Sequence, residues 1–287
     1  MSYVTLPKTI TPHPALDKQR KIIEHNPAIH SDALRVVLVN LMDAPAGYEV
    51  KFLRLIAASL RADDRPVHVT FWRPDSIEDT QDVQDHCALY YQKDLDLTAL
   101  DRVIISGRVP HQDSLEDEPY YPDITRLMED IKTRKVPTMA FCLAAHIGLF
   151  HFHSIPRKRL NAKLFGVFPQ DIAAPDAPFV KGLKGRSFDM PVSRFYYSDE
   201  GGIVGEANVQ VLATSKETGA SIVQDGSITY LTGHPEYAAN TLKLEYERDQ
   251  GLDTNALPLH YDVNNPQDSW SADSQIMIRA FLSDAVT

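Results

Sequence analysis

Short apolar runs alternate with amphipathic stretches along most of the chain. Leu34–Leu41 is almost continuously apolar, which is typical of a central parallel strand covered on both faces. Glu49–Leu60 follows with apolar residues at helical spacing. Strands alternating with helices predict an α/β fold built on a doubly wound, mostly parallel sheet flanked by helices. The other expected strands are Val67–Phe71, Leu100–Ser106, Phe165–Phe168 and a meander of Val209–Ala213, Ala220–Gln224 and Ser227–Thr232, and the other expected helices are Tyr121–Arg134, Ala238–Asp249 and Ser274–Leu282.

Three segments lack such a period. Residues 1–33 contain four prolines and predict an extended N-terminal arm with one short helical piece around Ala15–Glu24. Asp75–Asp85 is polar and acidic, which favours a loop with a helical turn, and Asp171–Leu183 is rich in Pro, Ala and Gly, which favours a loop. The chain is therefore divided into an arm, 1–33, and a single α/β domain, 34–287.

A cysteine lies at the joint between an apolar strand and a helix. Val136–Phe141 is the strand, and the residues after Cys142 are apolar at helical spacing. A side chain at a sharp strand-to-helix turn is pushed out of the sheet, above a helix N-terminus whose first N–H groups are unpaired. These features favour the thiolate and can stabilise an oxyanion. Cys142 is a candidate nucleophile, and a buried structural cysteine is the alternative.

A histidine and a glutamate follow another strand about ninety residues later. A cysteine nucleophile needs a base, and the base needs an acceptor that holds its ring. His234 and Glu236 are the candidates for these two roles, with Cys142 as the third member of a triad. Sites in such sheets lie at the carboxyl ends of the strands. The residues expected at these ends are Met42, Gly107, Cys142 and His234.

Composition narrows the class of protein. The net charge of −10 argues against nucleic acid as a partner, because binding phosphates requires basic patches. The two cysteines, Cys87 and Cys142, imply no disulfide framework and fit a cytoplasmic protein. No apolar run approaches the roughly 20 residues that span a bilayer, so we expect no membrane association. Small molecules remain as the expected substrates.

Several motifs occur in an order that resembles one enzyme family from about residue 34 to the C-terminus. The family is the homoserine O-acyltransferases (homoserine O-succinyltransferase and O-acetyltransferase), which are similar in fold to class I glutamine amidotransferases. The motifs are Asn40-Leu41-Met42, Phe52-Leu53-Arg54-Leu55, Ile105-Ser106-Gly107, Cys142, Lys163-Leu164-Phe165-Gly166-Val167-Phe168, Ser193-Arg194, Thr232-Gly233-His234-Pro235-Glu236-Tyr237 and Glu245-Tyr246-Glu247-Arg248-Asp249.

The resemblance implies a specific activity. An acyl group would pass from acyl-CoA, a co-substrate rather than a bound cofactor, through a thioester on Cys142 to an amino-acid hydroxyl in the methionine pathway. The family arm helps to form a homodimer, which implies one here. Arg248 would bind the acceptor carboxylate through its planar fork of donors. Lys163 and Ser193 match positions that contact the amino acid, and Tyr237 lies beside them in the sequence. The resemblance implies no metal.

Two departures concern the acyl donor. The family has proline and two lysines after Asn40-Leu41-Met42, whereas this chain has Asp43-Ala44-Pro45-Ala46-Gly47. Pro45 has no N–H, so the amide of Leu143 is the expected oxyanion donor. His111 stands where the family has glutamate with acetyl-CoA and glycine with succinyl-CoA. Its bulk favours acetyl, although a protonated imidazole could pair with the succinyl carboxylate and a solvated loop histidine is also possible.

A third departure concerns the acceptor. Leu143, His146 and Val192 replace the family's tryptophan, glutamine and histidine, so serine is an alternative to homoserine. Three other classes stay open: a non-catalytic binding or regulatory homologue, a glutaminase, and a zinc site. The glutaminase elbow Gly-x-Cys-x-Gly-x-Gln differs at Ala140, Ala144 and His146. The zinc candidates near Cys142 are His146, His151 and His153.

Overall fold

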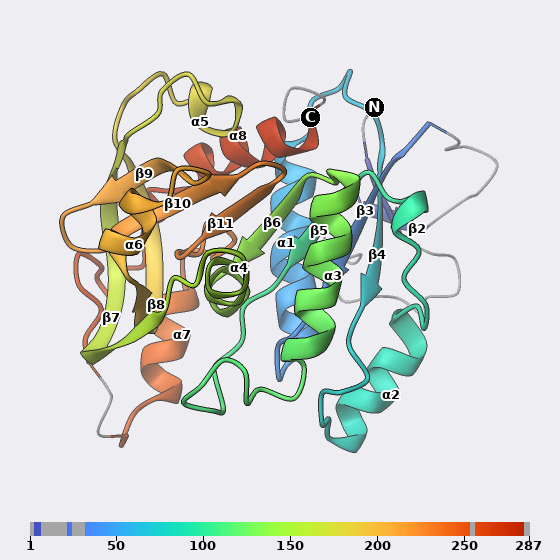
Figure 1. Ribbon diagram of the computed structural model, residues 1–287, viewed down its shortest axis with the longest axis horizontal. Coiled ribbons are helices and arrows are strands. Elements are labelled where there is room, and N and C mark those ends of the chain that lie inside the picture. Colours follow the sequence, from blue (N-terminus) through green and yellow to red (C-terminus); the bar gives the residue numbers. More distant parts are fainter. Residues whose placement is uncertain (1–2, 7–21, 25–31, 253–255, 284–287) are drawn as a thin grey trace.

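The computed structural model describes residues 3–6, 22–24, 32–252 and 256–283, and these form a mixed α/β sheet with helices on both faces (Figure 1). Its eleven described strands follow the order β2-β1-β4-β3-β5-β6-β11-β10-β9-β7-β8. The strands are β1 (Val4–Leu6), β2 (Ile22–Glu24), β3 (Leu34–Val39), β4 (Val67–Trp72), β5 (Arg102–Ile105), β6 (Thr138–Phe141), β7 (Arg157–Ile172), β8 (Phe188–Ser198), β9 (Gln210–Ser215), β10 (Gly219–Asp225) and β11 (Ile228–Leu231). The helices are α1 (Pro45–Ser59), α2 (Gln81–Tyr90), the 3-10 helix η2 (Leu97–Ala99), α3 (Tyr121–Arg134), α4 (Leu143–His153), α5 (Pro178–Lys181), α6 (Glu200–Gly205), α7 (Thr241–Arg248) and α8 (Ser271–Leu282).

The parallel half of the sheet confirms the predicted fold class. Strands β3, β5, β6 and β11 are neighbours and run parallel, so their carboxyl ends meet at one edge. The loops that follow these ends carry Met42, Gly107, Cys142 and His234. From β11 onward the pairing turns antiparallel through β10, β9, β7 and β8, and β9–β10–β11 is the expected meander.

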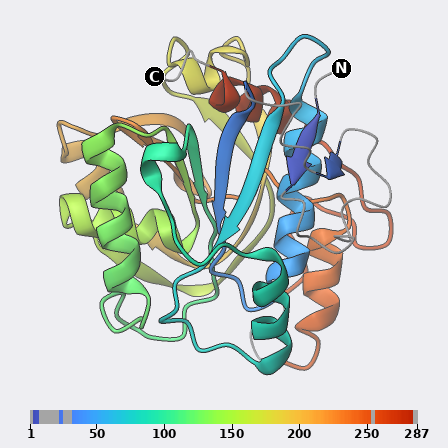
Figure 2. The ribbon, with the colours of Figure 1, turned by 90° about the vertical axis from the view of Figure 1, so that its right-hand side faces the viewer.

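Two apolar layers hold the sheet between its helices. On one face α1, α5 and α8 cover it, and their buried side chains include Phe52, Phe179 and Phe281. On the other face α3 and α4 cover it, with Ile124 and Ile147 among the buried residues. Figure 2 shows α1 and α3 on opposite sides of the central strands. Cys142 therefore lies between a β-strand and a helix that are both fixed by buried packing.

The local structure differs from several expectations. Of the helical piece expected around Ala15–Glu24, only residues 22–24 are described, and these form strand β2. Asp75–Asp85 was expected to be a loop with a helical turn, and its end belongs to the longer helix α2, which begins at Gln81; none of this helix is buried, so no apolar stripe marks it. Asp171–Leu183 is not a loop throughout, because it contains the end of strand β7 and the short helix α5. The eleven-residue strand β8 was not expected, because several of its polar side chains face a cavity rather than solvent.

The described helices include none that is both long and apolar enough to cross a membrane.

Candidate active site

Cys142 occupies a strained turn between β6 and α4. Its backbone has φ 48° and ψ −109°, in a region that residues other than glycine rarely adopt. The turn is held on both sides, because the Cys142 N–H donates to the carbonyl of Leu231 and its own carbonyl accepts from the N–H of His146. This is the geometry of a nucleophile elbow, with the first amides of α4 directly behind the sulfur.

Gly107 makes room for this turn. A β-carbon built on Gly107 would lie 2.8 Å from the Cβ of Cys142, closer than real contacts allow. Gly107→Ala is therefore expected to lower the free energy of unfolding by about 1–3 kcal/mol and to reduce activity, since the elbow must shift. Gly47→Ala is the matched control, because its added methyl meets nothing within 4 Å and lies in helix α1. Urea unfolding of both variants measures the effect, and equal stability of the two would contradict it.

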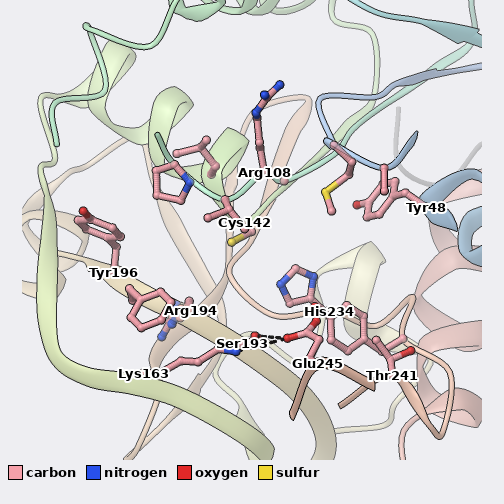
Figure 3. Close-up of a pocket in the computed structure, with 18 of the residues that line it drawn as sticks. Tyr48, Arg108, Cys142, Lys163, Ser193, Arg194, Tyr196, His234, Thr241 and Glu245 are labelled. Atoms are coloured by element: carbon pink, nitrogen blue, oxygen red, sulfur yellow. Dashed lines mark hydrogen bonds and ion pairs between the residues drawn. The ribbon is translucent and has the colours of Figure 1, made fainter. Parts of the chain in front are cut away.

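His234 and Glu236 form the expected pair. The Nδ1 atom of His234 lies 2.8 Å from Oε1 of Glu236, and both side chains are buried. This bond leaves the other ring nitrogen for Cys142, and Figure 3 shows Cys142 and His234 facing each other across a cavity. The ring of Tyr237 stacks on His234 with centroids 4.5 Å apart and fixes its plane.

The charge on His234 depends on its neighbours. Burial by itself lowers the pKa of His234, but the Glu236 carboxylate and the Cys142 sulfur outweigh it and raise the pKa to about 10. In the resting site His234 is therefore an imidazolium between two acidic groups. Acylation of Cys142 removes one of these two acidic groups, which lowers the pKa of His234 and lets the ring act as a base.

The cavity above Cys142 has a volume of about 360 Å³. Six lysines and arginines and one carboxylate, that of Glu245, are among the described residues lining it. The six cations are Lys51, Arg108, Arg157, Lys163, Arg194 and Arg248. A cavity with this excess of positive charge suits anionic ligands.

Three of the predicted substrate-binding residues, Lys163, Ser193 and Tyr237, surround Glu245. Its carboxylate accepts hydrogen bonds of 2.5 Å from Ser193 and from the Tyr237 hydroxyl, and Lys163 lies 3.6 Å away. Burial favours the neutral acid, but these groups prevail and lower the pKa of Glu245. A buried, ionised carboxylate close to His234 is suited to an ammonium group. Glu245 stands in the quoted motif Glu245-Tyr246-Glu247-Arg248-Asp249, so the sequence did carry a signal for it.

Arg248 lies at the rim of the same region. Its side chain is 60% exposed and its Nε donates to Asp249 at 2.7 Å, while Lys163 contacts Asp249 at 3.0 Å. Arg248 lines the cavity, and its role in binding a ligand carboxylate stays a prediction.

Two other cationic side chains line the cavity that the loop after Met42 also lines, the loop in which the family has two lysines and this chain has none. Arg108 is buried, pairs with Asp43 at 2.5 Å and also donates to the Leu41 carbonyl. Lys51 lies 4.7 Å above the Tyr237 ring. The sequence did not single out either residue, because both lie outside the quoted motifs.

His111 is not part of the cavity wall. Its side chain is 51% exposed and its Nε2 lies 3.6 Å from Asp43. The steric reason for expecting acetyl, which required His111 to fill the acyl pocket, therefore has no support in the structure.

The three histidines near Cys142 point to different partners. His146 contacts the Ser198 hydroxyl, His151 contacts Glu129 and His153 contacts Asp225, each at 2.8 Å. Within the described residues, no group of three or more His, Cys, Asp and Glu side chains could hold a metal ion.

His146 is buried and neutral. Burial, with Arg194 and Arg157 nearby, lowers its pKa to about 3. Because the unfolded state takes up a proton below about pH 6.5 and the folded state does not, this group's contribution to stability is lost as pH falls from 6.5 toward 3. Between pH 7 and pH 5, this effect should lower the free energy of unfolding by about 2 kcal/mol. Urea unfolding of wild type and His146→Gln at both pH values measures it, and parallel losses in the two proteins would contradict it.

Sequence comparison decides the family. The sequence model of the family described as homoserine O-succinyltransferase matches residues 4–286. The chain belongs to this family. Similar proteins include a homoserine O-acetyltransferase of Bacillus cereus strain 03BB102, 29% identical over 262 residues that cover 88% of this chain and 85% of that protein. A homoserine O-acetyltransferase of Geobacillus kaustophilus is 29% identical over 296 residues, covering 98% and 95%.

Solved structures extend the likeness to the fold. A glutamine amidotransferase of Thermotoga maritima superposes with a TM-score of 0.63 at 15% identity, covering 88% of this chain and 98% of that one. A glutamine amidotransferase of Methylobacillus flagellatus gives a TM-score of 0.59 at 8% identity, covering 87% and 92%. The class I glutamine amidotransferase-like fold is thus confirmed for this member of the homoserine O-succinyltransferase family.

Proposed function

We propose that the protein transfers an acyl group from acyl-CoA to the side-chain hydroxyl of homoserine or serine through a thioester on Cys142. The observation that carries the proposal is the elbow cysteine facing a histidine that Glu236 holds at 2.8 Å. Membership of the homoserine O-succinyltransferase family supports acyl transfer to homoserine. The triad supplies the nucleophile, the base and the group that orients the base.

The first half-reaction acylates the enzyme. The Cys142 thiolate attacks the thioester carbonyl carbon, and the N–H of Leu143 at the start of α4 stabilises the oxyanion. The bond between the carbonyl carbon and the coenzyme sulfur then breaks, while the new bond to Sγ remains. His234 protonates the departing coenzyme thiolate. Because it has given its proton to the coenzyme thiolate, His234 is neutral for the next step.

The second half-reaction transfers the acyl group. The acceptor ammonium binds Glu245 and its carboxylate binds Arg248, which places the hydroxyl near His234. His234 takes the hydroxyl proton as the oxygen attacks the acyl-enzyme, and Sγ leaves as the thiolate. Serine is one methylene shorter than homoserine, and such a difference is worth only about 1–3 kcal/mol in a pocket.

The test is product formation by the wild-type protein. Acetyl-CoA or succinyl-CoA is supplied with homoserine or serine, released coenzyme thiol is measured with a disulfide dye, and the O-acyl amino acid is identified by mass. We expect an ester product with at least one donor and acceptor. Ammonia release from glutamine without ester formation would instead identify a glutaminase, and neither reaction in a folded protein would identify a binding homologue.

A further inference from the structure

Tyr48 lines the cavity but has no role in the proposed mechanism. It lies in the first turn of α1, borders the same cavity as Cys142 and His234, and is only 3% exposed. Figure 3 shows Tyr48 and Tyr196 on opposite sides of Cys142, with the Tyr48 hydroxyl turned toward the cavity. The Tyr48 ring packs on the ring of Phe52, with centroids 4.9 Å apart. This contact within α1 fixes the position of the hydroxyl.

The Tyr48 hydroxyl lacks a hydrogen-bond partner among the described residues. Oε2 of Glu236, the carboxylate oxygen that does not bind His234, also lacks a partner, so the hydroxyl and this oxygen do not pair with each other. The backbone N–H of Gly107 acts on the phenol oxygen, but an N–H can only donate and leaves the phenol proton without an acceptor. A buried donor that stays unpaired is costly, so its place in a substrate cavity indicates an acceptor that arrives with the substrate.

The phenol of Tyr48 keeps its proton. Burial, together with the charges of Glu236 and Cys142, raises the pKa of Tyr48 well above its usual range and outweighs the Gly107 N–H, which lowers it. At neutral pH the side chain is therefore an uncharged O–H donor. Such a group can stabilise negative charge on a ligand oxygen without giving up its proton.

The hydroxyl borders the elbow together with the first amide of α4. A β-carbon built on Gly107 would lie 2.8 Å from the Cβ of Cys142 and 3.7 Å from the backbone nitrogen of Leu143, so Gly107 lies directly against the elbow. The Gly107 N–H is also close enough to the phenol oxygen to change the pKa of Tyr48. The Tyr48 hydroxyl and the Leu143 N–H thus approach the same turn, one from α1 and the other from α4.

We propose that the Tyr48 hydroxyl is a second oxyanion donor, which hydrogen-bonds the carbonyl oxygen of the acyl group while that oxygen carries negative charge. This rests on the proposed function and adds a catalytic residue to it. When Sγ bonds to the carbonyl carbon, an electron pair of the C=O bond moves to the oxygen, and the phenol donates to it without transferring its proton. The pair returns as the bond to the coenzyme sulfur breaks, and His234 protonates that sulfur. A second oxyanion forms when the acceptor oxygen attacks the acyl-enzyme.

The test measures the rate of acyl-enzyme formation by the wild type and by Tyr48→Phe. Each protein is mixed with saturating acetyl-CoA or succinyl-CoA without acceptor, quenched at short times and analysed by intact mass. The variant keeps the ring that packs on Phe52 and loses only the hydroxyl. Its acylation rate should fall about 10²-fold, with an unchanged half-saturating donor concentration, because the hydrogen bond stabilises only the charged oxygen.

Two further measurements distinguish this role from a structural one. Alkylation of Cys142 by iodoacetamide forms no oxyanion, so Tyr48→Phe should be alkylated at the wild-type rate. The thermal unfolding midpoint of Tyr48→Phe should equal or exceed that of the wild type, because the substitution removes a buried hydroxyl that has no partner.

Tyr230→Phe is the matched control. Tyr230 is fully buried on β11, its hydroxyl also lacks a partner among the described residues, and it does not line the cavity. This variant loses the same atom as Tyr48→Phe and should be acylated at the wild-type rate.

Acylation of Tyr48→Phe at the wild-type rate would overturn this inference and leave the proposed function intact. Equal losses of acylation and alkylation would also overturn it, because the hydroxyl would then act on the Cys142 nucleophile rather than on the acyl oxygen. A lowered unfolding midpoint would assign the hydroxyl a structural role instead. Failure of both donors to acylate the wild type would remove the proposed function, and this inference with it.

Discussion

Replacing Cys142 with alanine is expected to lower the rate of O-acyl ester formation by about 10⁴-fold or more, because no other group in the triad can carry the acyl chain. The fold should survive, since the substitution removes one sulfur atom from a turn whose backbone is held by Leu231 and His146. The measurement is the turnover rate with a saturating donor and homoserine, alongside the thermal unfolding midpoint of both proteins.

Cys87 offers a matched control for this prediction. It lies on helix α2, away from the cavity, and burial raises the pKa of its thiol to about 11. Cys87→Ala should therefore retain wild-type turnover. Substantial turnover by a folded Cys142→Ala protein would mean that the acyl group passes directly from coenzyme A to the acceptor.

Glu236→Gln is expected to give the second-largest loss, about 10³–10⁴-fold in turnover. The substitution keeps the size of the side chain but removes the negative charge 2.8 Å from Nδ1 of His234. The ring loses its fixed tautomer and its pKa falls from about 10. At neutral pH the His234 imidazolium that faces Cys142 is then less populated. The rate of Cys142 alkylation by iodoacetamide at pH 7 should fall together with turnover.

The same pair links stability to pH. The pKa of His234 is about 10 in the folded state and about 6.5 when unfolded, so its ion pair adds stability that is fully present below pH 6.5 and is lost as pH rises through 10. The stability difference between wild type and Glu236→Gln should shrink across that range. Glu217→Gln is the matched control, because it removes a carboxylate from an exposed histidine pair, His260–Glu217. A difference that stays constant from pH 6 to pH 10 would contradict the raised pKa.

The fold was largely predictable because its central elements carry their own pattern. Leu34–Val39 and Thr138–Phe141 are buried strands with continuous apolar runs, and Tyr121–Arg134 has an apolar stripe and the bounds that were predicted. Helix α2 was predicted only as a helical turn because it buries no residue, and β8 was missed because several of its side chains line a cavity. An apolar period marks an element only where one of its faces packs against other apolar residues. Helix α2 has no buried face, and part of β8 lines a cavity with polar side chains, so this signal is weak in both.

The residues of the site were likewise only partly predictable from the sequence. Cys142, His234 and Glu236 were predictable because Cys142 directly follows a strand, the other two lie in the loop after another strand, and the chemistry needs those residue types together. Another part of the cavity wall was not, because His146, Arg157 and Arg194 come from α4, β7 and β8, and only three-dimensional packing shows that they line one cavity. The interpretation of His111 rested on its position in the family pattern, and no local feature of the sequence could show that it lies outside the cavity wall.

The most direct test of the central claim is a single-turnover mass measurement of the wild-type protein. Acyl-CoA is added without acceptor, the acylated peptide is located by fragmentation, and homoserine is then added. The account predicts one acyl group on Cys142 and none on Cys87, followed by its loss as an equal amount of O-acyl ester forms. Ester formation while Cys142 stays unmodified throughout the turnover would contradict the acyl-enzyme and the role assigned to the triad.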